Sequence, residues 1–165
     1  MFEEDFTTGP EHEAIELFQR AYAAQQANDY EAAIELYRHS IAVYPTAEAH
    51  TFLGWVYSFQ ERYDEAIDEC LAAIRVDPAF GNPYNDIGSY LIAKGDLYNC
   101  LRWFRGALRA PRYASYAFPH FNLGRVYEQR GRLLDAARHF GLALEAEPNF
   151  TQATKALRRV QARLN

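Results

Sequence analysis

The chain is poor in the residues and segments on which several kinds of fold depend. It has only two cysteines, Cys70 and Cys100, which are too few for a disulfide framework, so we expect both to be reduced core residues. Its longest unbroken apolar run covers the five residues 70–74, whereas a membrane-spanning helix needs about 20, so no membrane span is predicted. The residues after Met1 are acidic and lack the apolar stretch of a secretory signal, which makes a cytoplasmic location the expectation.

Constellations of catalytic or metal-binding residues are also missing from the sequence. It contains no Walker loop, no dinucleotide-binding glycine pattern and no HExxH spacing among its five histidines. Ser89 lacks the second glycine of a nucleophile elbow. Glu65, Asp68 and Glu69 lie on an exposed helical face, whereas acid–base catalysis needs a shielded pocket. We therefore predict no catalytic residue, no metal and no cofactor, and expect the protein not to be an enzyme.

The chain does contain enough apolar material for a folded core, and its charge is unevenly distributed. Apolar residues make up 49% and charged residues 24%, which is typical of a folded soluble domain. The net charge of −5 conceals 16 acids and four bases in residues 1–80, against six acids and 13 bases in residues 81–165. The two halves therefore carry −12 and +7, and the molecule is electrically polarised.

A repeated pattern runs through most of the chain. A Leu-Gly or Ile-Gly pair recurs at Gly54, Gly88 and Gly124, with spacings of 34 and 36 residues. A glycine at this place lets the backbones of two helices approach closely. Further marks follow each glycine at constant distances, and a proline closes each unit: Ala66, Cys100 and Ala136; Cys70, Phe104 and Phe140; Ala73, Ala107 and Ala143; Pro45, Pro78, Pro111 and Pro148.

This pattern resembles the tetratricopeptide repeat family, whose helix-turn-helix unit has about 34 residues with Leu-Gly, Tyr, Ala, Phe and Pro at these offsets. The resemblance covers residues 14–148, with Arg20 and Ala21 in place of Leu-Gly in the most divergent first copy. It implies an all-α fold, a right-handed superhelical solenoid of four antiparallel helix pairs with a C-terminal capping helix.

The predicted domain organisation follows from the repeat marks. Residues 1–12 form an N-terminal leader, and the repeats fill residues 13–148 as units of about 14–46, 47–80, 81–116 and 117–148. Residues 149–165 place apolar residues on one helical face and basic residues elsewhere. Because a terminal repeat needs a polar outer cover, we predict that this segment is a capping helix.

The resemblance further implies a concave groove lined by the first helix of each unit. Aromatic side chains there would give a large contact area, and asparagines could donate to and accept from the backbone of a bound peptide. Phe18, Tyr22 and Phe121 have a second interpretation, in which they pack between neighbouring first helices. The predicted groove residues are Phe18, Tyr22, Thr51, Trp55, Phe59, Asn82, Asn85, Ser89, Phe118, Phe121 and Arg125.

One known version of such a groove is missing. Repeat proteins that hold the C-terminal carboxylate of heat-shock chaperones use lysines, an arginine and asparagines on three consecutive first helices. The corresponding places here hold no lysine: they are Phe18, Tyr22, Phe52, Asn82 and Asp86, or, one repeat later, Thr51, Trp55, Asp86, Phe118 and Asn122. We therefore do not expect the chain to bind chaperone tails through such a clamp.

Two other surface features have more than one interpretation. Four arginines lie at helical spacing, namely Arg102, Arg105, Arg109 and Arg112. They form an ordinary solvated surface, a site for an acidic partner, including the acidic half of a second copy, or, as a weaker third interpretation, a site for nucleic acid. The linker 111–119 carries two extra residues, which either expose aromatic side chains near the groove or are a tolerated insertion.

Together these observations predict a non-catalytic protein–protein interaction adaptor that binds a peptide segment or a partner protein in its groove. Two alternatives are a scaffold that self-assembles through its oppositely charged ends and a small secretion-type chaperone. The expected partner is a protein or peptide, with a homo-oligomer as a further candidate. Neither a membrane nor a nucleic acid is expected, because the chain as a whole is acidic.

Overall fold

A computed structural model of the chain describes residues 9–165, and within them it contains nine α-helices and no β-strand. The predicted all-α class is confirmed for this part of the chain. The helices form two compact units, one ending at Asp77 and one beginning at Pro78. Residues 1–8 of the predicted leader lie outside the described residues, and the first helix begins at Pro10.

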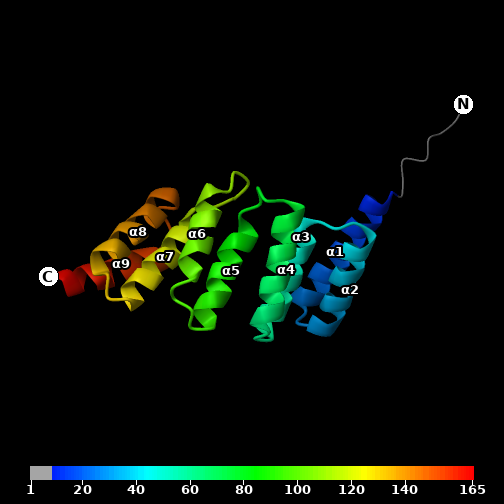
Figure 1. Ribbon diagram of the computed structural model, residues 1–165, viewed down its shortest axis with the longest axis horizontal. Coiled ribbons are helices and arrows are strands. Elements are labelled where there is room, and N and C mark those ends of the chain that lie inside the picture. The colour runs from blue at the N-terminus through cyan, green and yellow to red at the C-terminus, as the bar shows by residue number, and fades with distance from the viewer. Residues whose placement is uncertain (1–8) are drawn as a thin grey trace, which may run out of the picture. The chain divides into compact units, whose positions relative to one another are not determined.

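Unit 1 consists of two antiparallel helix pairs. They are α1 (Pro10–Gln26) with α2 (Tyr30–Val43), and α3 (Ala47–Phe59) with α4 (Tyr63–Val76). Each helix packs on the next in the chain, and α1 also touches α3, so the first helices of the two pairs are neighbours (Figure 1).

Unit 2 repeats this arrangement and adds a fifth helix. Its pairs are α5 (Asn82–Ala93) with α6 (Cys100–Arg109), and α7 (Ala117–Gln129) with α8 (Leu133–Ala146). The first helices α5 and α7 again touch each other, and α9 (Thr151–Leu164) packs on α8 (Figure 1). Ala153, Ala156 and Val160 form the buried face of α9. Glu128 of α7 binds Arg159 of α9, with an N···O distance of 2.7 Å.

The turn inside each helix pair uses one residue in the left-handed region of φ. Asn28 and Glu61 have φ of 60° and 58°, and Gly95 and Gly131 have φ of 83° and 73°. Asparagine and glycine tolerate this conformation, so the residue types account for three of these turns. Glu61 gives no such signal.

Close approach of paired helices depends on glycine at two places in unit 2. A Cβ on Gly88 would lie 2.5 Å from the Phe104 ring, and one on Gly124 would lie 2.6 Å from the Phe140 ring. Both rings are fully buried. Cys70 and Cys100 are likewise buried in the core, as predicted, and burial raises the pKa of Cys100 to about 11.

The longer linker after α6 folds against the start of unit 2. Gly81 N donates to Arg112 O at 2.9 Å, and Arg112 N donates to Ala79 O at 3.0 Å, which forms an isolated parallel bridge. Tyr113 is half-buried and packs on Gly81, and burial raises its pKa. Tyr116 is 36% exposed, and its hydroxyl donates to Ala110 O.

Candidate functional site

The first helices of unit 1 share an aromatic surface made of Phe18, Tyr22, Phe52 and Trp55. Phe18 and Tyr22 are four residues apart and therefore lie on one face of α1. Their ring centroids lie 5.1 and 5.8 Å from that of Phe52 on α3, and the Phe52 and Trp55 centroids are 4.6 Å apart. The structure thus brings three predicted groove residues together around Phe52, which the predicted groove set omits.

The aromatic surface has a buried side and a side that faces water. Phe18 is half-buried and also packs edge-on against Tyr37, whose hydroxyl donates to Gln25 within the core. Tyr22 remains 43% exposed. Phe18 therefore contributes to packing, and Tyr22 offers aromatic area to a partner.

Two further predicted groove residues of unit 1 lie elsewhere. Thr51 is 1% exposed and its hydroxyl donates to Ala47 O, so its assignment to a binding surface is wrong. A threonine hydroxyl in a helix can donate a hydrogen bond to a backbone carbonyl of the preceding turn, so burying it leaves no unpaired donor. Phe59 is 55% exposed and stacks on Tyr30, with 5.6 Å between the ring centroids.

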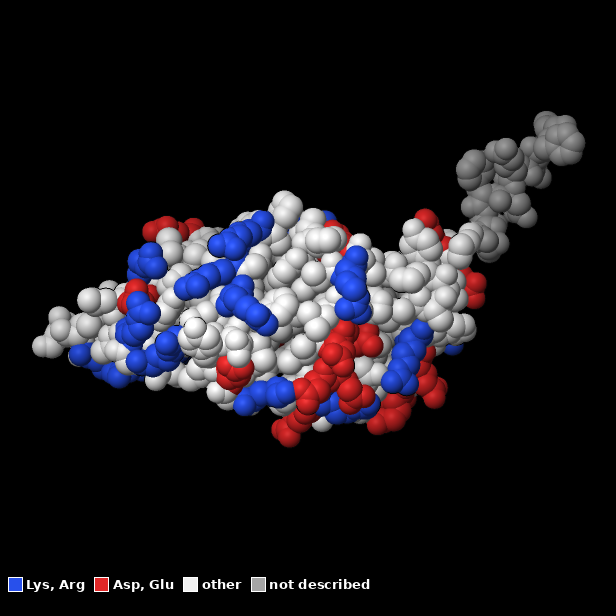
Figure 2. Space-filling model, in the orientation of Figure 1, with Lys and Arg blue, Asp and Glu red and all other residues white. Residues whose placement is uncertain are grey.

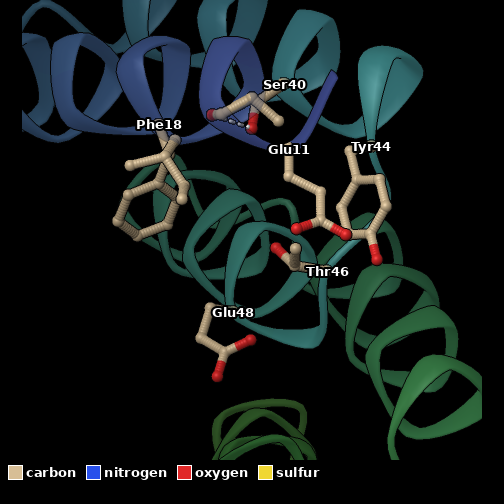
Figure 3. Close-up of a pocket in the computed structure, with 8 residues that line it drawn as sticks. Glu11, Phe18, Ser40, Tyr44, Thr46 and Glu48 are labelled. Carbon is tan, nitrogen blue, oxygen red and sulfur yellow. Dashed lines mark hydrogen bonds between the residues drawn. The ribbon is translucent and has the colours of Figure 1, made fainter. Parts of the chain in front are cut away.

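A pocket of about 300 Å³ lies where α1, the end of α2 and the start of α3 meet in unit 1. Figure 3 shows Phe18 on one side of it, Tyr44 on the other, and Glu11, Thr46 and Glu48 around it. No motif in the sequence indicates this pocket, because its residues come from three helices and a turn. Its lining is Glu11, Ala14, Ile15, Phe18, Ser40, Tyr44, Thr46 and Glu48.

The first helices of unit 2 carry a polar network in place of the aromatic surface. Asn122 of α7 donates to Asn85 Oδ1 of α5 at 3.1 Å and to Ser89 Oγ at 3.5 Å. Arg125 donates to Asn122 Oδ1 at 3.4 Å. Asn85, Ser89 and Arg125 are predicted groove residues, and the structure joins them through Asn122. Asn122 comes directly after the predicted groove residue Phe121, and Phe52 comes directly after the predicted groove residue Thr51. This shared position in the repeat could have identified both as site residues.

The remaining predicted groove residues of unit 2 differ in exposure. Asn82 is half-exposed at the first position of α5, and Phe118 is 46% exposed beside Phe150. Phe121 packs against Phe140 and Phe150, with centroid distances of 5.7 and 4.9 Å. Its contacts favour the packing interpretation.

The four predicted arginines are exposed, and three of them also have contacts within unit 2. Arg102 lies 5.2 Å over the Trp103 ring. Arg105 donates to the Tyr127 hydroxyl at 3.2 Å, as Arg38 donates to Tyr57 in unit 1. Arg112 lies 4.1 Å over the Phe80 ring. Figure 2 shows basic side chains gathered over the face of unit 2 that carries α6. Arg102 and Arg109 are both exposed residues of α6.

The histidines at the start of α3 and α7 make different pairs. His50 Nδ1 lies 2.6 Å from Glu69 Oε2, whereas His120 Nδ1 lies 3.1 Å from His139 Nδ1. Burial, reinforced by the charge of His120, lowers the pKa of His139 to about 4. Within residues 9–165, no group of three or more His, Cys, Asp or Glu residues is placed to hold a metal ion. No helix in this range is both long and apolar enough to cross a membrane.

Family models match both units of the chain. A tetratricopeptide repeat model matches residues 13–80, and a second model of the same name matches residues 117–150. Together they cover more than half of the chain.

Part of the chain is also similar to a curated protein that contains tetratricopeptide repeats. The chain is 35% identical over 74 residues to the small glutamine-rich tetratricopeptide repeat-containing protein 2 of Mycosarcoma maydis. That match covers 44% of this chain and about a fifth (21%) of the length of that curated relative.

Solved structures extend the likeness to most of the chain. The structure of pilF from Pseudomonas aeruginosa is 19% identical, with a TM-score of 0.87 over 94% of this chain and 71% of that one. The first TPR of Spaghetti (RPAP3), bound to the HSP90 peptide SRMEEVD, is 25% identical, with a TM-score of 0.66 over 72% of this chain and 93% of that one. The fold is therefore an all-α solenoid of this type.

Proposed function

Because the chain belongs to the tetratricopeptide repeat family, we propose that it is a non-catalytic adaptor that binds a peptide segment or partner protein on its first helices. The observation that carries the proposal is the aromatic surface of α1 and α3, where Tyr22 stays 43% exposed beside Phe52 and Trp55. Aromatic side chains with few rotatable bonds are the residues on which binding energy concentrates.

The polar network of unit 2 supports the same function with different chemistry. Asn85 and Arg125 place an amide and a cation on adjacent first helices, and the buried Asn122 joins them. Such groups can pair with the backbone of an extended peptide. We do not propose the HSP90 peptide seen with the Spaghetti repeat as a ligand, because the clamp places in this chain hold no lysine.

The test is capture of a partner from native lysate by the wild-type chain and by Trp55→Ala. We expect the variant to lose at least about tenfold of the captured partner, since a central aromatic anchor contributes about 2 kcal/mol or more. Leu134→Ala is the control, because Leu134 is 75% exposed and belongs to the second helix α8, not to a first helix. Equal capture by wild type and Trp55→Ala, with unchanged circular dichroism, would contradict the proposal.

The unequal charge of the chain favours one second candidate, a scaffold of like copies. Residues 1–80 carry −12 and residues 81–165 carry +7, so the acidic half of one copy attracts the basic half of another. Sedimentation velocity separates the candidates. The scaffold requires oligomers at low salt that dissociate at high salt, whereas the adaptor binds its partner as a monomer.

A further inference from the structure

The pocket of unit 1 presents large apolar side chains to water beside the aromatic surface. Ile15 is 54% exposed and Tyr44 is 40% exposed, and with Ala14 and Phe18 they make an apolar wall. Exposed apolar area that gathers in a concavity marks a site for a complementary apolar group. A volume of about 300 Å³ lies at the lower end for small-ligand pockets, which suits one or two side chains.

Both charged residues that line the pocket are acidic. They are Glu11 on α1 and Glu48 on α3 (Figure 3). The Glu11 carboxylate beside the Tyr44 hydroxyl raises the pKa of Tyr44 above its usual value. A carboxylate has about four lone-pair sites, so Glu11 can accept further hydrogen bonds. The rim of the pocket therefore attracts cations and repels anions.

The hydroxyl groups in the lining already have partners within unit 1. Ser40 Oγ donates to Ala14 O at 2.7 Å, and Thr46 Oγ1 accepts from Ala49 N at 3.1 Å, which caps α3. Recognition of a charged group in the pocket thus depends on the two carboxylates. The surrounding field has the same sign, because residues 9–77 carry 13 acids and four bases.

We infer that this pocket binds a basic, apolar peptide segment of a partner protein. One large apolar side chain, such as leucine, enters between Ile15 and Tyr44, and a neighbouring lysine or arginine pairs with Glu11 or Glu48. The inference rests on the proposed adaptor function and adds the chemical class of the partner segment. The chain's own first residues do not fit this site, because Glu3, Glu4 and Asp5 have the same charge as its rim.

The probe is a set of three fluorescent nine-residue peptides that differ only at the centre and its neighbours. One has leucine flanked by two lysines on each side, one has serine in place of leucine, and one has glutamates in place of the lysines. Fluorescence anisotropy with the full chain should show the leucine–lysine peptide binding at least about tenfold more tightly than either control peptide. Its affinity should fall as salt is raised, because the paired charges are near the surface.

Three substitutions locate the binding in the pocket. Ile15→Lys should abolish it, and Glu11→Gln or Glu48→Gln should weaken it about threefold to tenfold and reduce its salt dependence. Glu13→Gln is the matched control, because it removes the same charge from an exposed place on α1 that does not line the pocket. Ile15 is exposed on the helix surface, and circular dichroism verifies that each variant is folded.

The outcomes separate this inference from the adaptor function on which it rests. Equal binding of all three peptides, or loss of binding with Glu13→Gln as large as with Glu11→Gln, overturns the inference. If Trp55→Ala abolishes partner capture while Ile15→Lys leaves it intact, the adaptor stands and the pocket inference fails. If neither variant affects capture, both fail. Self-association of the chain that Ile15→Lys abolishes, without peptide binding, would identify a second copy as the occupant and likewise overturn the inference.

Discussion

His120 and His139 of unit 2 occupy the places that His50 and Glu69 occupy in unit 1, since both pairs differ by 70 residues. Two adjacent imidazoles cannot both hold a charge at low cost. His139 is 8% exposed and stacks on Tyr127, so water does not compensate for that charge. Unit 2 therefore contains a buried imidazole that resists protonation.

Unit 2 should lose stability as the pH falls from about 6.5 to about 4. The unfolded chain protonates His139 near the ordinary value of 6.5, but burial keeps its folded pKa at about 4. Within this window the unfolded state binds more protons, so the free energy of unfolding declines with pH and is fully retained above 6.5. The total loss is about 3 kcal/mol, by the ordinary conversion of a pKa difference.

His139→Phe and His139→Glu test this source of acid sensitivity. Phenylalanine removes the titrating group, and glutamate recreates beside His120 the kind of pair that His50 makes with Glu69. In urea titrations at pH 7.5 and 4.5, both variants should lose less stability on acidification than the wild type. An equal loss in wild type and His139→Phe would show that other groups cause the acid sensitivity.

Single residues also show where the sequence was a limited guide to the site. Trp55, Tyr22 and Phe18 were predicted from their places in the repeat, and the structure brings them into one surface. Thr51 has an equally suitable place but is buried, because its short side chain bonds to its own helix. A helical period gives the direction of a side chain, but its exposure depends on neighbouring helices that the period does not describe.

At the scale of the elements, helix pairing depends on the space between one glycine and one aromatic ring. In the pair α7–α8, Gly124 faces the Phe140 ring, and a Cβ there would lie 2.6 Å from it. Gly141 lies in the same pair, within α8, and an added Cβ meets nothing within 4 Å. These two glycines therefore allow a matched comparison.

Alanine at the two positions should change stability in opposite directions. Gly124→Ala forces the buried Phe140 ring to move, and overpacking of this kind costs about 1 to 3 kcal/mol. Gly141→Ala should stabilise the helix by about 0.5 to 1 kcal/mol, because alanine loses less backbone entropy on folding. Thermal unfolding followed by circular dichroism measures both changes. A Gly124→Ala variant as stable as Gly141→Ala would show that α7 and α8 are not packed through this contact.

The boundaries of the elements were less predictable than their pairing. By its position in the repeat, α6 should begin near Leu97, as the other second helices begin at the corresponding place. It begins instead at Cys100. The Asp96 carboxylate accepts hydrogen bonds from Tyr98 N and from Asn99 N and Nδ2, which holds these residues in a turn. These bonds also lower the pKa of Asp96. Such local competition with a helix start depends on geometry that repeat marks do not encode.

At the scale of the whole molecule, the change in charge coincides with the border between the two units. The border lies between Asp77 and Pro78, and residues 78–80 are uncharged, so the acidic half is unit 1 and the basic half is unit 2. The repeat period predicted the succession of helix pairs, but it did not predict that they form two compact units with a border at this place. The charge on the two sides of this border has opposite sign, because charge follows composition and not helix periodicity.

A chain with a sequence pI of about 5.5 should therefore still bind a cation exchanger at pH 7.5 and low salt. Surface patches, and not the net charge, determine adsorption when opposite charges lie on separate parts of a molecule. The exposed arginines of α6 should supply much of this binding, and raising the salt should elute the protein. Arg102→Gln with Arg109→Gln should shift elution to clearly lower salt, whereas Glu13→Gln with Glu61→Gln, an equal number of changes in unit 1, should not. Passage of the wild-type protein through the column without retention would show that the basic surface of unit 2 is too weak to attract an acidic partner.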